Sequence, residues 1–252
     1  MNILELKKLS KSFNGTKAVN GVSIGFEKGR VTGLIGPNGA GKTTLFHLIN
    51  GFLKPDEGQI FYRGSRIDGL KPWQVAKLGI GRLFQDVRVF GRMTALDNIL
   101  AAFPHQLGEN PFAAIFKSRK IAKAEAEIKE KAFHWLKFVG LSGCEGRFAE
   151  DLSYGQQKLL SIARLLALGS ETLLLDEPVS GISPQMLRPL LSLIGRLAEE
   201  EKRAVVVIEH NMGVISEVSN WIYFMAEGKI ILSGQPSDVL ANPEVRKVYI
   251  GY

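Results

Sequence analysis

A glycine-rich segment of the sequence has the residue types and spacing of a phosphate-binding loop. Residues 36–43 read GPNGAGKT and fit the pattern G-x-x-x-x-G-K-[ST] at every position. Glycines let the backbone curve around an anion with its N–H groups pointing inward, and a helix that begins at the loop adds partial positive charge. Lys42 can reach the β- and γ-phosphates of a nucleotide, and the Thr43 hydroxyl can bind Mg²⁺. The candidate phosphate-binding residues are Gly36, Pro37, Asn38, Gly39, Ala40, Gly41, Lys42, Thr43 and Thr44.

The residues on both sides of this loop favour phosphate binding over a chance glycine-rich turn. Residues 31–35, VTGLI, are short, apolar and bounded by glycines, which is typical of a buried strand. Residues 43–50 predict a helix that ends before Gly51. The motif requires a strand before it and a helix after it, and the sequence predicts both.

Two acidic residues follow a second apolar strand. Residues 172–175 predict this strand, and Asp176 and Glu177 come directly after it. Ligands of open parallel sheets bind at the carboxyl ends of the strands, so both acids are expected at a binding edge. Asp176 is the expected Mg²⁺ ligand, directly or through water, and Glu177 is expected to orient and deprotonate the attacking water. The alternative, an acidic loop without a role, does not explain why a phosphate-binding loop accompanies it.

A histidine follows a third predicted strand. Residues 204–208, AVVVI, are apolar, and Glu209-His210 comes next. A single histidine is usually structural or exposed. His210 follows a buried strand as Asp176 does, so it can point to the same edge of the sheet. We therefore expect His210 to act at the γ-phosphate.

The segment Leu152-Ser153-Tyr154-Gly155-Gln156 resembles the signature sequence of the ATP-binding cassette family, which other P-loop ATPases lack. It precedes a predicted helix over 155–167, with Ser153 as the expected N-cap. The resemblance implies that Ser153, Gly155 and Gln156 bind ATP held by a partner cassette, so that two cassettes enclose two ATP molecules. A hydroxyl, a glycine N–H and a helix N-terminus suit an anion. Homodimer and heterodimer both stay open.

The resemblance extends to further positions. Phe13 matches the aromatic residue that stacks on adenine, although a core phenylalanine is the alternative. Gln85 matches a glutamine that senses Mg²⁺ and links to a helical subdomain, and His210 matches the switch histidine. Two residues depart from the family pattern: Tyr154 replaces the commonest glycine of the signature, and Ser183 stands where many cassettes have aspartate. The second departure concerns how the loop after the catalytic acid couples the two sites.

Three stretches resemble one branch of the family, the ATP-binding subunits of branched-chain amino-acid importers. They are residues 152–158 (LSYGQQK), 84–90 (FQDVRVF) and 242–249 (NPEVRKVY). The extra length between Phe103 and Lys131 is a fourth mark. Amide and urea importers share these marks, and the lipopolysaccharide-export cassette shares some of them. The sequence does not name the transported solute.

The expected fold is α/β, a P-loop NTPase (RecA-like) core with a parallel sheet, an N-terminal antiparallel β-subdomain and an inserted α-helical subdomain. Residues 1–252 are expected to form one cassette, with the core in 1–85 and 153–252 and the helical subdomain in 86–152. The apolar spacing of residues 121–139 is helical. Other expected elements are strands at 2–7, 19–26 and 59–62, a helix at 184–200 and a hairpin formed by 222–225 and 229–232.

Composition limits the cellular setting. The chain has 252 residues, of which 45% are hydrophobic and 23% charged, and this argues against disorder. Its single cysteine, Cys144, excludes an internal disulfide. The sequence holds no secretory signal and no run near the ~18 apolar residues that a spanning helix needs. We therefore expect a peripheral protein at the cytoplasmic face of the inner membrane, docked on permease subunits and served indirectly by a solute-binding protein.

A cassette ATPase that acts on nucleic acid is the main alternative, because the net charge of +7 permits it. Repair relatives carry a long coiled coil between the phosphate loop and the signature, and translation relatives carry two cassettes per chain. Neither feature occurs in this sequence, so no nucleic-acid partner is expected. A P-loop kinase or GTPase does not explain the signature.

Overall fold

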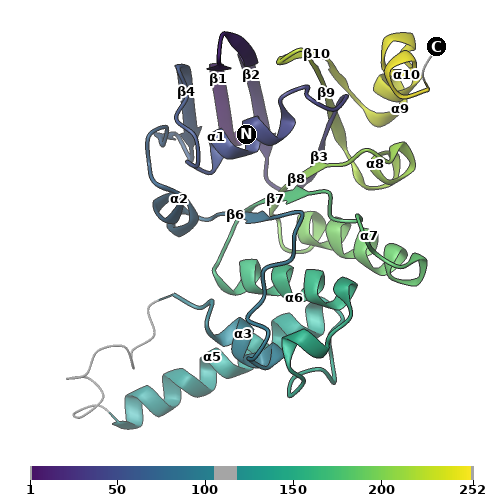
Figure 1. The fold of residues 1–252 in the computed structure, drawn as a ribbon. Helices are drawn as coiled ribbons and strands as arrows, with labels where there is room; N and C mark the ends of the chain where they lie inside the picture. The colour runs from purple at the N-terminus through teal and green to yellow at the C-terminus, as the bar shows by residue number, and fades with distance from the viewer. Residues whose placement is uncertain (1, 105–117, 251–252) are drawn as a thin grey trace. The chain divides into compact units, whose positions relative to one another are not determined.

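The computed structural model describes residues 2–104 and 118–250, which form two compact units (Figure 1). The first unit comprises residues 1–85, 171–180 and 187–252. The second comprises residues 86–170 and 181–186, so it is inserted into the first along the chain.

A six-stranded sheet organises the first unit, in the order β10-β9-β3-β8-β7-β6. Its strands are β3 (Arg30–Ile35), β6 (Ile80–Leu83), β7 (Thr172–Asp176), β8 (Ala204–Ile208), β9 (Trp221–Ala226) and β10 (Lys229–Gly234). The five strands from β9 to β6 run parallel, and only β10 is antiparallel to its neighbour β9. Every residue of β7 and β8 is buried, as expected for central strands of a parallel sheet that is covered on both faces. The predicted strands at 31–35, 172–175 and 204–208 are confirmed, and so is the hairpin at 222–232.

The N-terminal part forms a separate antiparallel sheet in the order β2-β1-β4-β5. Its strands are β1 (Asn2–Phe13), β2 (Thr16–Glu27), β4 (Glu57–Tyr62) and β5 (Ser65–Arg66). The first two extend beyond the predicted 2–7 and 19–26, because a tight turn at Asn14 and Gly15, both with positive φ, joins them directly. The expected antiparallel β-subdomain is therefore confirmed.

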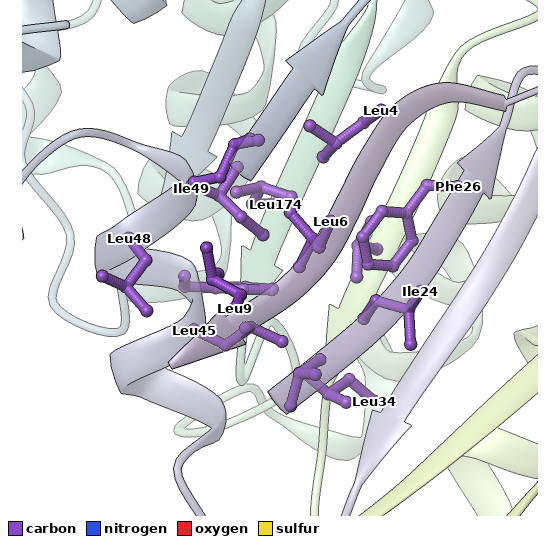
Figure 2. Close-up of a cluster of buried hydrophobic side chains, with 14 of the residues drawn as sticks. Leu4, Leu6, Leu9, Ile24, Phe26, Leu34, Leu45, Leu48, Ile49 and Leu174 are labelled. Atoms are coloured by element: carbon purple, nitrogen blue, oxygen red, sulfur yellow. The ribbon is translucent and has the colours of Figure 1, made fainter. Parts of the chain in front are cut away.

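A hydrophobic core lies beside β3 and the helix that follows it, α1 (Lys42–Ile49) (Figure 2). Leu4, Leu6 and Leu9 of β1 lie against apolar residues of β2, β3, β7 and α1. Burying each such side chain contributes roughly 1.5–3 kcal/mol. The loop that joins β3 to α1 is thus anchored at both ends in a well-packed core.

The remaining helices of the first unit include several that the sequence pattern did not predict. The helices are α2 (Pro72–Leu78), α7 (Pro184–Glu199), α8 (Met212–Val218), α9 (Pro236–Ala241) and α10 (Pro243–Ile250). Only α7 was expected, at 184–200. The first three residues of α7 belong to the second unit.

The second unit is built from α3 (Ala95–Leu100), α5 (Ser118–Phe138), a short 3₁₀ turn at Ala149–Asp151 and α6 (Tyr154–Ala167). The predicted helix at 121–139 is confirmed, whereas residues 105–117 of the expected extra length lie outside the described residues. The structure differs from the expected division at residues 153–170 and 181–186, which lie in the second unit. α6 belongs to the second unit, although the expected core resumed at residue 153, because α6 contacts both α3 and α5. In the described part of the chain, no helix is both long enough and apolar enough to cross a membrane.

Candidate nucleotide-binding site

The loop between β3 and α1 is a tight backbone curve that depends on two of its glycines. Gly36 has φ +151°, and a Cβ atom there would lie 1.9 Å from the Met225 carbonyl oxygen. Gly41 has φ +102°, and its Cβ would lie 2.0 Å from the Ala18 oxygen. The turn between β9 and β10 also contacts the loop, since the Gly228 N–H donates to the Ala40 carbonyl at 3.1 Å. Any side chain at Gly36 or Gly41 would therefore deform the curve.

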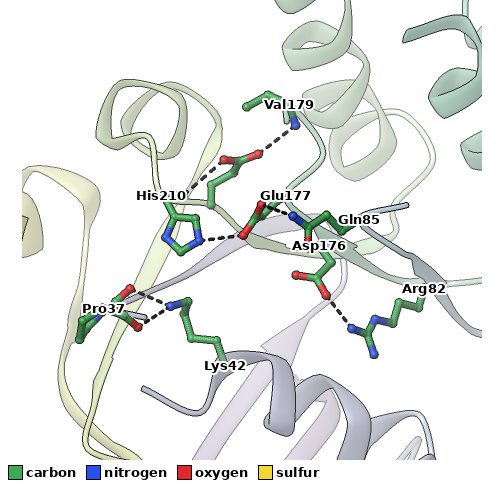
Figure 3. A network of polar contacts seen from close by, with 10 residues as sticks. Pro37, Lys42, Arg82, Gln85, Asp176, Glu177, Val179 and His210 are labelled. Carbon is green, nitrogen blue, oxygen red and sulfur yellow. Dashed lines mark hydrogen bonds and ion pairs between the residues drawn. The ribbon is translucent and has the colours of Figure 1, made fainter. Parts of the chain in front are cut away.

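Lys42 extends back over this loop. Its ammonium donates to the carbonyl oxygens of Gly36 at 2.7 Å and Pro37 at 2.8 Å (Figure 3). Burial lowers the pKa of Lys42, while the negative charges of Glu177 and Asp176 oppose that shift. The two acids thus favour a positive charge beside the loop, where the phosphates of a nucleotide would add to their effect.

A cavity of about 200 Å³ lies over the loop. The residues that line it are Ala18, Asn38, Gly39, Ala40, Gly41, Lys42, Thr43, Thr44, Glu177, Ile208 and His210. The fold therefore brings Glu177 and His210, which follow β7 and β8, to the phosphate-binding loop, which follows β3. These strands are neighbours in the parallel sheet, so their carboxyl ends meet at one edge.

Asp176, the last residue of β7, forms a buried ion pair with Arg82 of β6. The guanidinium nitrogen Nη2 lies 2.6 Å from Oδ2 of Asp176, and the two side chains are 4% and 9% exposed. The guanidinium also lies over the rings of Phe46 and Phe84, with its carbon 5.6 Å and 4.8 Å from their centroids. Asp176 is therefore held in place through one of its two oxygens.

Glu177 lies between two polar partners. Its Oε1 is 2.7 Å from Nε2 of His210, and its Oε2 accepts a hydrogen bond of 3.0 Å from the Gln85 amide (Figure 3). The Glu177 backbone has φ +47°, a left-handed conformation that is strained for a residue other than glycine. Its N–H donates to the Ile208 carbonyl at 2.9 Å, which fixes this turn against β8. The strained turn directs the carboxylate into the cavity.

Phe13 is 43% exposed at the end of β1 and is not among the residues that line the cavity. This exposure excludes the alternative of a core phenylalanine. Lys11 places its ammonium 5.8 Å from the centroid of the Phe13 ring. The ring is therefore accessible for stacking.

The signature residues Ser153, Gly155 and Gln156 lie in the second unit, at the start of α6. Ser153 is the N-cap, as expected: its hydroxyl accepts from the Gln156 N–H at 3.3 Å, and the Gln156 side chain accepts from the Ser153 N–H at 3.0 Å. These two bonds form a capping box at the start of α6. A Cβ atom added at Gly155 would lie 3.5 Å from the Met186 side chain, which is an ordinary van der Waals distance.

The described residues contain no group of three or more His, Cys, Asp or Glu side chains that could hold a metal ion. The expected Mg²⁺ donors are instead a hydroxyl, an amide oxygen and one carboxylate, from Thr43, Gln85 and Asp176. Hard oxygen donors of this kind fit Mg²⁺, which proteins commonly bind through one or two carboxylates together with substrate phosphates. The donor set fits a metal ion that arrives with a nucleotide.

Two residues belong to this site although neither was predicted to have a role. Arg82 is a charged residue inside an otherwise apolar strand, which is the signal that could have identified it. Glu209 is only 4% exposed, and its carboxylate accepts from the Val179 N–H at 2.9 Å and the His210 N–H at 3.3 Å. No local pattern in the sequence distinguishes Glu209 from an exposed glutamate at the end of a strand.

Comparison with known proteins agrees with this geometry. The family model described as ABC transporter matches residues 19–180, and a model for an AAA domain, putative AbiEii toxin, Type IV TA system, matches the shorter stretch 145–216. The chain is 40% identical over 249 residues to the high-affinity branched-chain amino acid transport ATP-binding protein BraF of Pseudomonas aeruginosa, covering 99% of this chain and 98% of that protein. It is also 40% identical over 253 residues to the probable branched-chain amino acid transport ATP-binding protein LivG of Archaeoglobus fulgidus, covering 100% and 96%.

The fold agrees with that of solved relatives. The crystal structure of the ADP conformation of MJ1267, an ATP-binding cassette of an ABC transporter, superimposes with a TM-score of 0.84 at 36% identity and full coverage of both chains. The chain belongs to the ABC transporter family. ATP binding and ATP hydrolysis, the expected activities, follow from membership of this ATPase family.

Proposed function

We propose that this chain is the ATP-hydrolysing subunit of an importer for branched-chain amino acids. The observation that supports the solute class is its similarity, over 99–100% of its length, to proteins named for branched-chain amino acid transport. Urea and amide importers, or a cassette of the lipopolysaccharide-export type, are the alternatives that the sequence motifs leave open.

The arrangement of side chains supports the following division of work. The backbone of residues 36–44 and the Lys42 ammonium bind the phosphates of ATP, and Phe13 stacks on the adenine. Glu177, which lines the cavity over the phosphate loop, orients and deprotonates the attacking water as the general base. His210 holds Glu177 through the 2.7 Å contact and faces the γ-phosphate. Gln85 contacts the same carboxylate and directly precedes the first residue of the second unit in the chain, so it couples the site to that unit.

Thr43, Gln85 and Asp176 would hold Mg²⁺, which neutralises charge on the phosphates when bound. Arg82 keeps Asp176 in position, because its guanidinium holds one carboxylate oxygen at 2.6 Å and leaves the other oxygen for a cation.

Partners are part of the proposal. Ser153, Gly155 and Gln156 cap the ATP of a second cassette, either an identical chain or a related one. Permease subunits span the inner membrane, with this chain on their cytoplasmic face, and a solute-binding protein delivers the solute to them. No nucleic-acid partner is proposed.

The test is solute uptake in a strain that lacks the gene. Uptake of labelled leucine, isoleucine and valine is measured after complementation with the wild-type chain, with Glu177→Gln and with Glu171→Gln. The last variant makes the same chemical change at a residue before β7, where the carboxylate pairs with Lys28 and Arg63. We expect uptake to return with the wild-type chain and Glu171→Gln but not with Glu177→Gln. The purified Glu177→Gln chain should still bind ATP and accumulate as a dimer.

Other outcomes would revise the proposal. If the deletion strain loses uptake of urea or amides but takes up the three amino acids normally, the chain serves another importer branch. Normal uptake of every solute in the deletion strain, with ribosomal or DNA-associated proteins co-purifying, would reject the transport role. Full turnover by Glu177→Gln would remove Glu177 from the role of general base.

A further inference from the structure

Glu209 joins the two loops that carry the reacting side chains. Its carboxylate accepts the Val179 N–H at 2.9 Å through Oε1 and the His210 N–H at 3.3 Å through Oε2 (Figure 3). Val179 belongs to the loop after β7, whereas His210 follows β8. Glu209 directly precedes His210 in the chain, so the bond to the Val179 N–H is the one that joins the loop after β8 to the loop after β7.

These contacts close a ring around the proposed general base. Val179 is two residues after Glu177, and His210 contacts the Glu177 carboxylate at 2.7 Å. The ring therefore runs from Glu177 along the chain to Val179, through the Glu209 carboxylate to His210, and back to Glu177. The Glu209 carboxylate thus contacts both segments that carry the partners of the 2.7 Å contact between His210 and Glu177.

Stability alone does not account for a carboxylate at this position. Glu209 is 4% exposed, and burial raises its pKa, with the nearby negative charge of Glu177 acting in the same direction. A buried carboxylate is costly unless donors satisfy it, and here two backbone N–H groups do so. Burial and the neighbouring Glu177 carboxylate both disfavour a negative charge on Glu209. The bonds of Glu209 instead fix the position of the loop after β7 relative to the loop after β8.

We infer that Glu209 is a positioning residue for ATP hydrolysis, which holds His210 and the loop after Glu177 in the one arrangement that supports the general base. This inference rests on the proposed function of the same site. Glu209 does not line the cavity, so it acts through His210 and the loop and does not touch the nucleotide itself.

The experiment compares Glu209→Gln with the wild-type full-length chain. Glutamine has the same shape, but its NH₂ group would face one of the two backbone N–H donors, so only one bond survives. Glu171→Gln is the matched control, because it makes the same substitution in the same unit at the opposite end of β7. Measurements are kcat and KM for ATP, the Kd of a fluorescent ADP analogue, and hydrogen exchange of peptides that contain Val179 and His210. Glu177→Gln and His210→Ala are measured in the same series.

We expect Glu209→Gln to lower kcat by about tenfold or more, since it weakens a charge-assisted contact that orients the base. The Kd of the ADP analogue should stay within about twofold of the wild-type value, because the phosphate loop is untouched. Exchange should rise at Val179 and His210 and not in the phosphate loop. The loss of kcat in the double variant Glu209→Gln/His210→Ala should be smaller than the sum of the two single losses (in free energy), because part of the effect of Glu209 passes through the His210 side chain.

Two results would overturn the inference while the proposed function stands: a kcat for Glu209→Gln equal to that of Glu171→Gln, or fully additive losses in the double variant. If Glu177→Gln hydrolyses ATP at the wild-type rate, the proposed catalytic site fails and the inference fails with it. Should Glu209→Gln not fold, Glu209→Asp makes the same test, since it keeps the charge but is one methylene too short to span both loops. A kcat for Glu209→Asp equal to the wild-type value would likewise overturn the inference.

Discussion

At the scale of single residues, the site combines strain with strong local support. Glu177 adopts φ +47°, and the hydrogen bond from its N–H to Ile208 holds it there. Strained backbone of this kind costs of order 1–3 kcal/mol and persists only where neighbouring structure enforces it. This backbone conformation directs the Glu177 carboxylate toward the phosphate loop. The glycines of that loop serve the same purpose, since they allow a curve that no other residue could follow.

The first prediction concerns Gly36. Gly36→Ala should lower the free energy of unfolding by about 3 kcal/mol, because the added Cβ would lie 1.9 Å from a carbonyl oxygen of β9. Gly39→Ala is the control: Gly39 has φ +80° but no atom within 4 Å of an added Cβ. It should lose only about 1–2 kcal/mol, the usual cost of a left-handed conformation. Urea denaturation measures both, and equal losses would contradict the assigned role of the close approach to β9.

At the scale of elements, each group of site residues lies where a strand or helix begins or ends. The phosphate loop, Glu177 and His210 follow the parallel strands β3, β7 and β8, whose order in the sheet brings their ends together. The signature residues begin α6. Helix N-termini carry unpaired N–H groups, and the loops that follow strands are free to carry functional side chains, so binding and catalytic residues concentrate at these positions.

The second prediction separates the two roles of the α6 N-cap. Ser153→Ala should lower stability by about 1 kcal/mol, the usual cost of a lost cap. Thr94→Ala is the matched control, because the Thr94 hydroxyl caps α3 of the same unit by accepting from the Asp97 N–H at 3.0 Å. Both variants should lose similar stability, whereas only Ser153→Ala should also lower ATP turnover. Similar turnover in the two variants would show that the Ser153 hydroxyl does nothing beyond capping.

At the scale of the whole molecule, one unit is inserted into the other between β6 and β7. These two strands pair in parallel, although residues 86–170 of the second unit separate them in the chain. The buried ion pair between Arg82 and Asp176 joins the same two strands. It therefore links the segments on either side of the insertion and positions an acid of the site.

The third prediction addresses this pair. Arg82→Met should lower the free energy of unfolding by about 3–5 kcal/mol, because it leaves a buried carboxylate without its partner. The double variant Arg82→Met/Asp176→Asn should be more stable than Arg82→Met, since it removes the uncompensated charge. Chemical denaturation of the four proteins in this cycle gives the coupling free energy. Additive losses would indicate that Arg82 contributes by packing against Phe46 and Phe84 alone.

The features that the sequence alone determined are those encoded in short, continuous segments. The phosphate loop, the two acids at the end of β7, His210 and the signature are each recognisable because a few adjacent residues carry both the chemistry and the strand or helix that presents it. The apolar strands beside these motifs predicted the α/β core, and the apolar spacing of residues 121–139 predicted the inserted helical part. β6 escaped prediction because the charged Arg82 interrupts its apolar run, and α2 escaped because its seven residues carry too little helical periodicity.

The tertiary structure decided what depends on neighbours that are distant in the chain. Arg82 acquires its partner 94 residues away, and Glu209 acquires a backbone partner 30 residues away. The exposure of Phe13 and the membership of α6 in the second unit likewise depend on what packs against them. No local pattern contains such information, because burial and charge pairing are properties of the folded chain. The sequence thus determined which groups could react, and the fold decided which groups hold them in place.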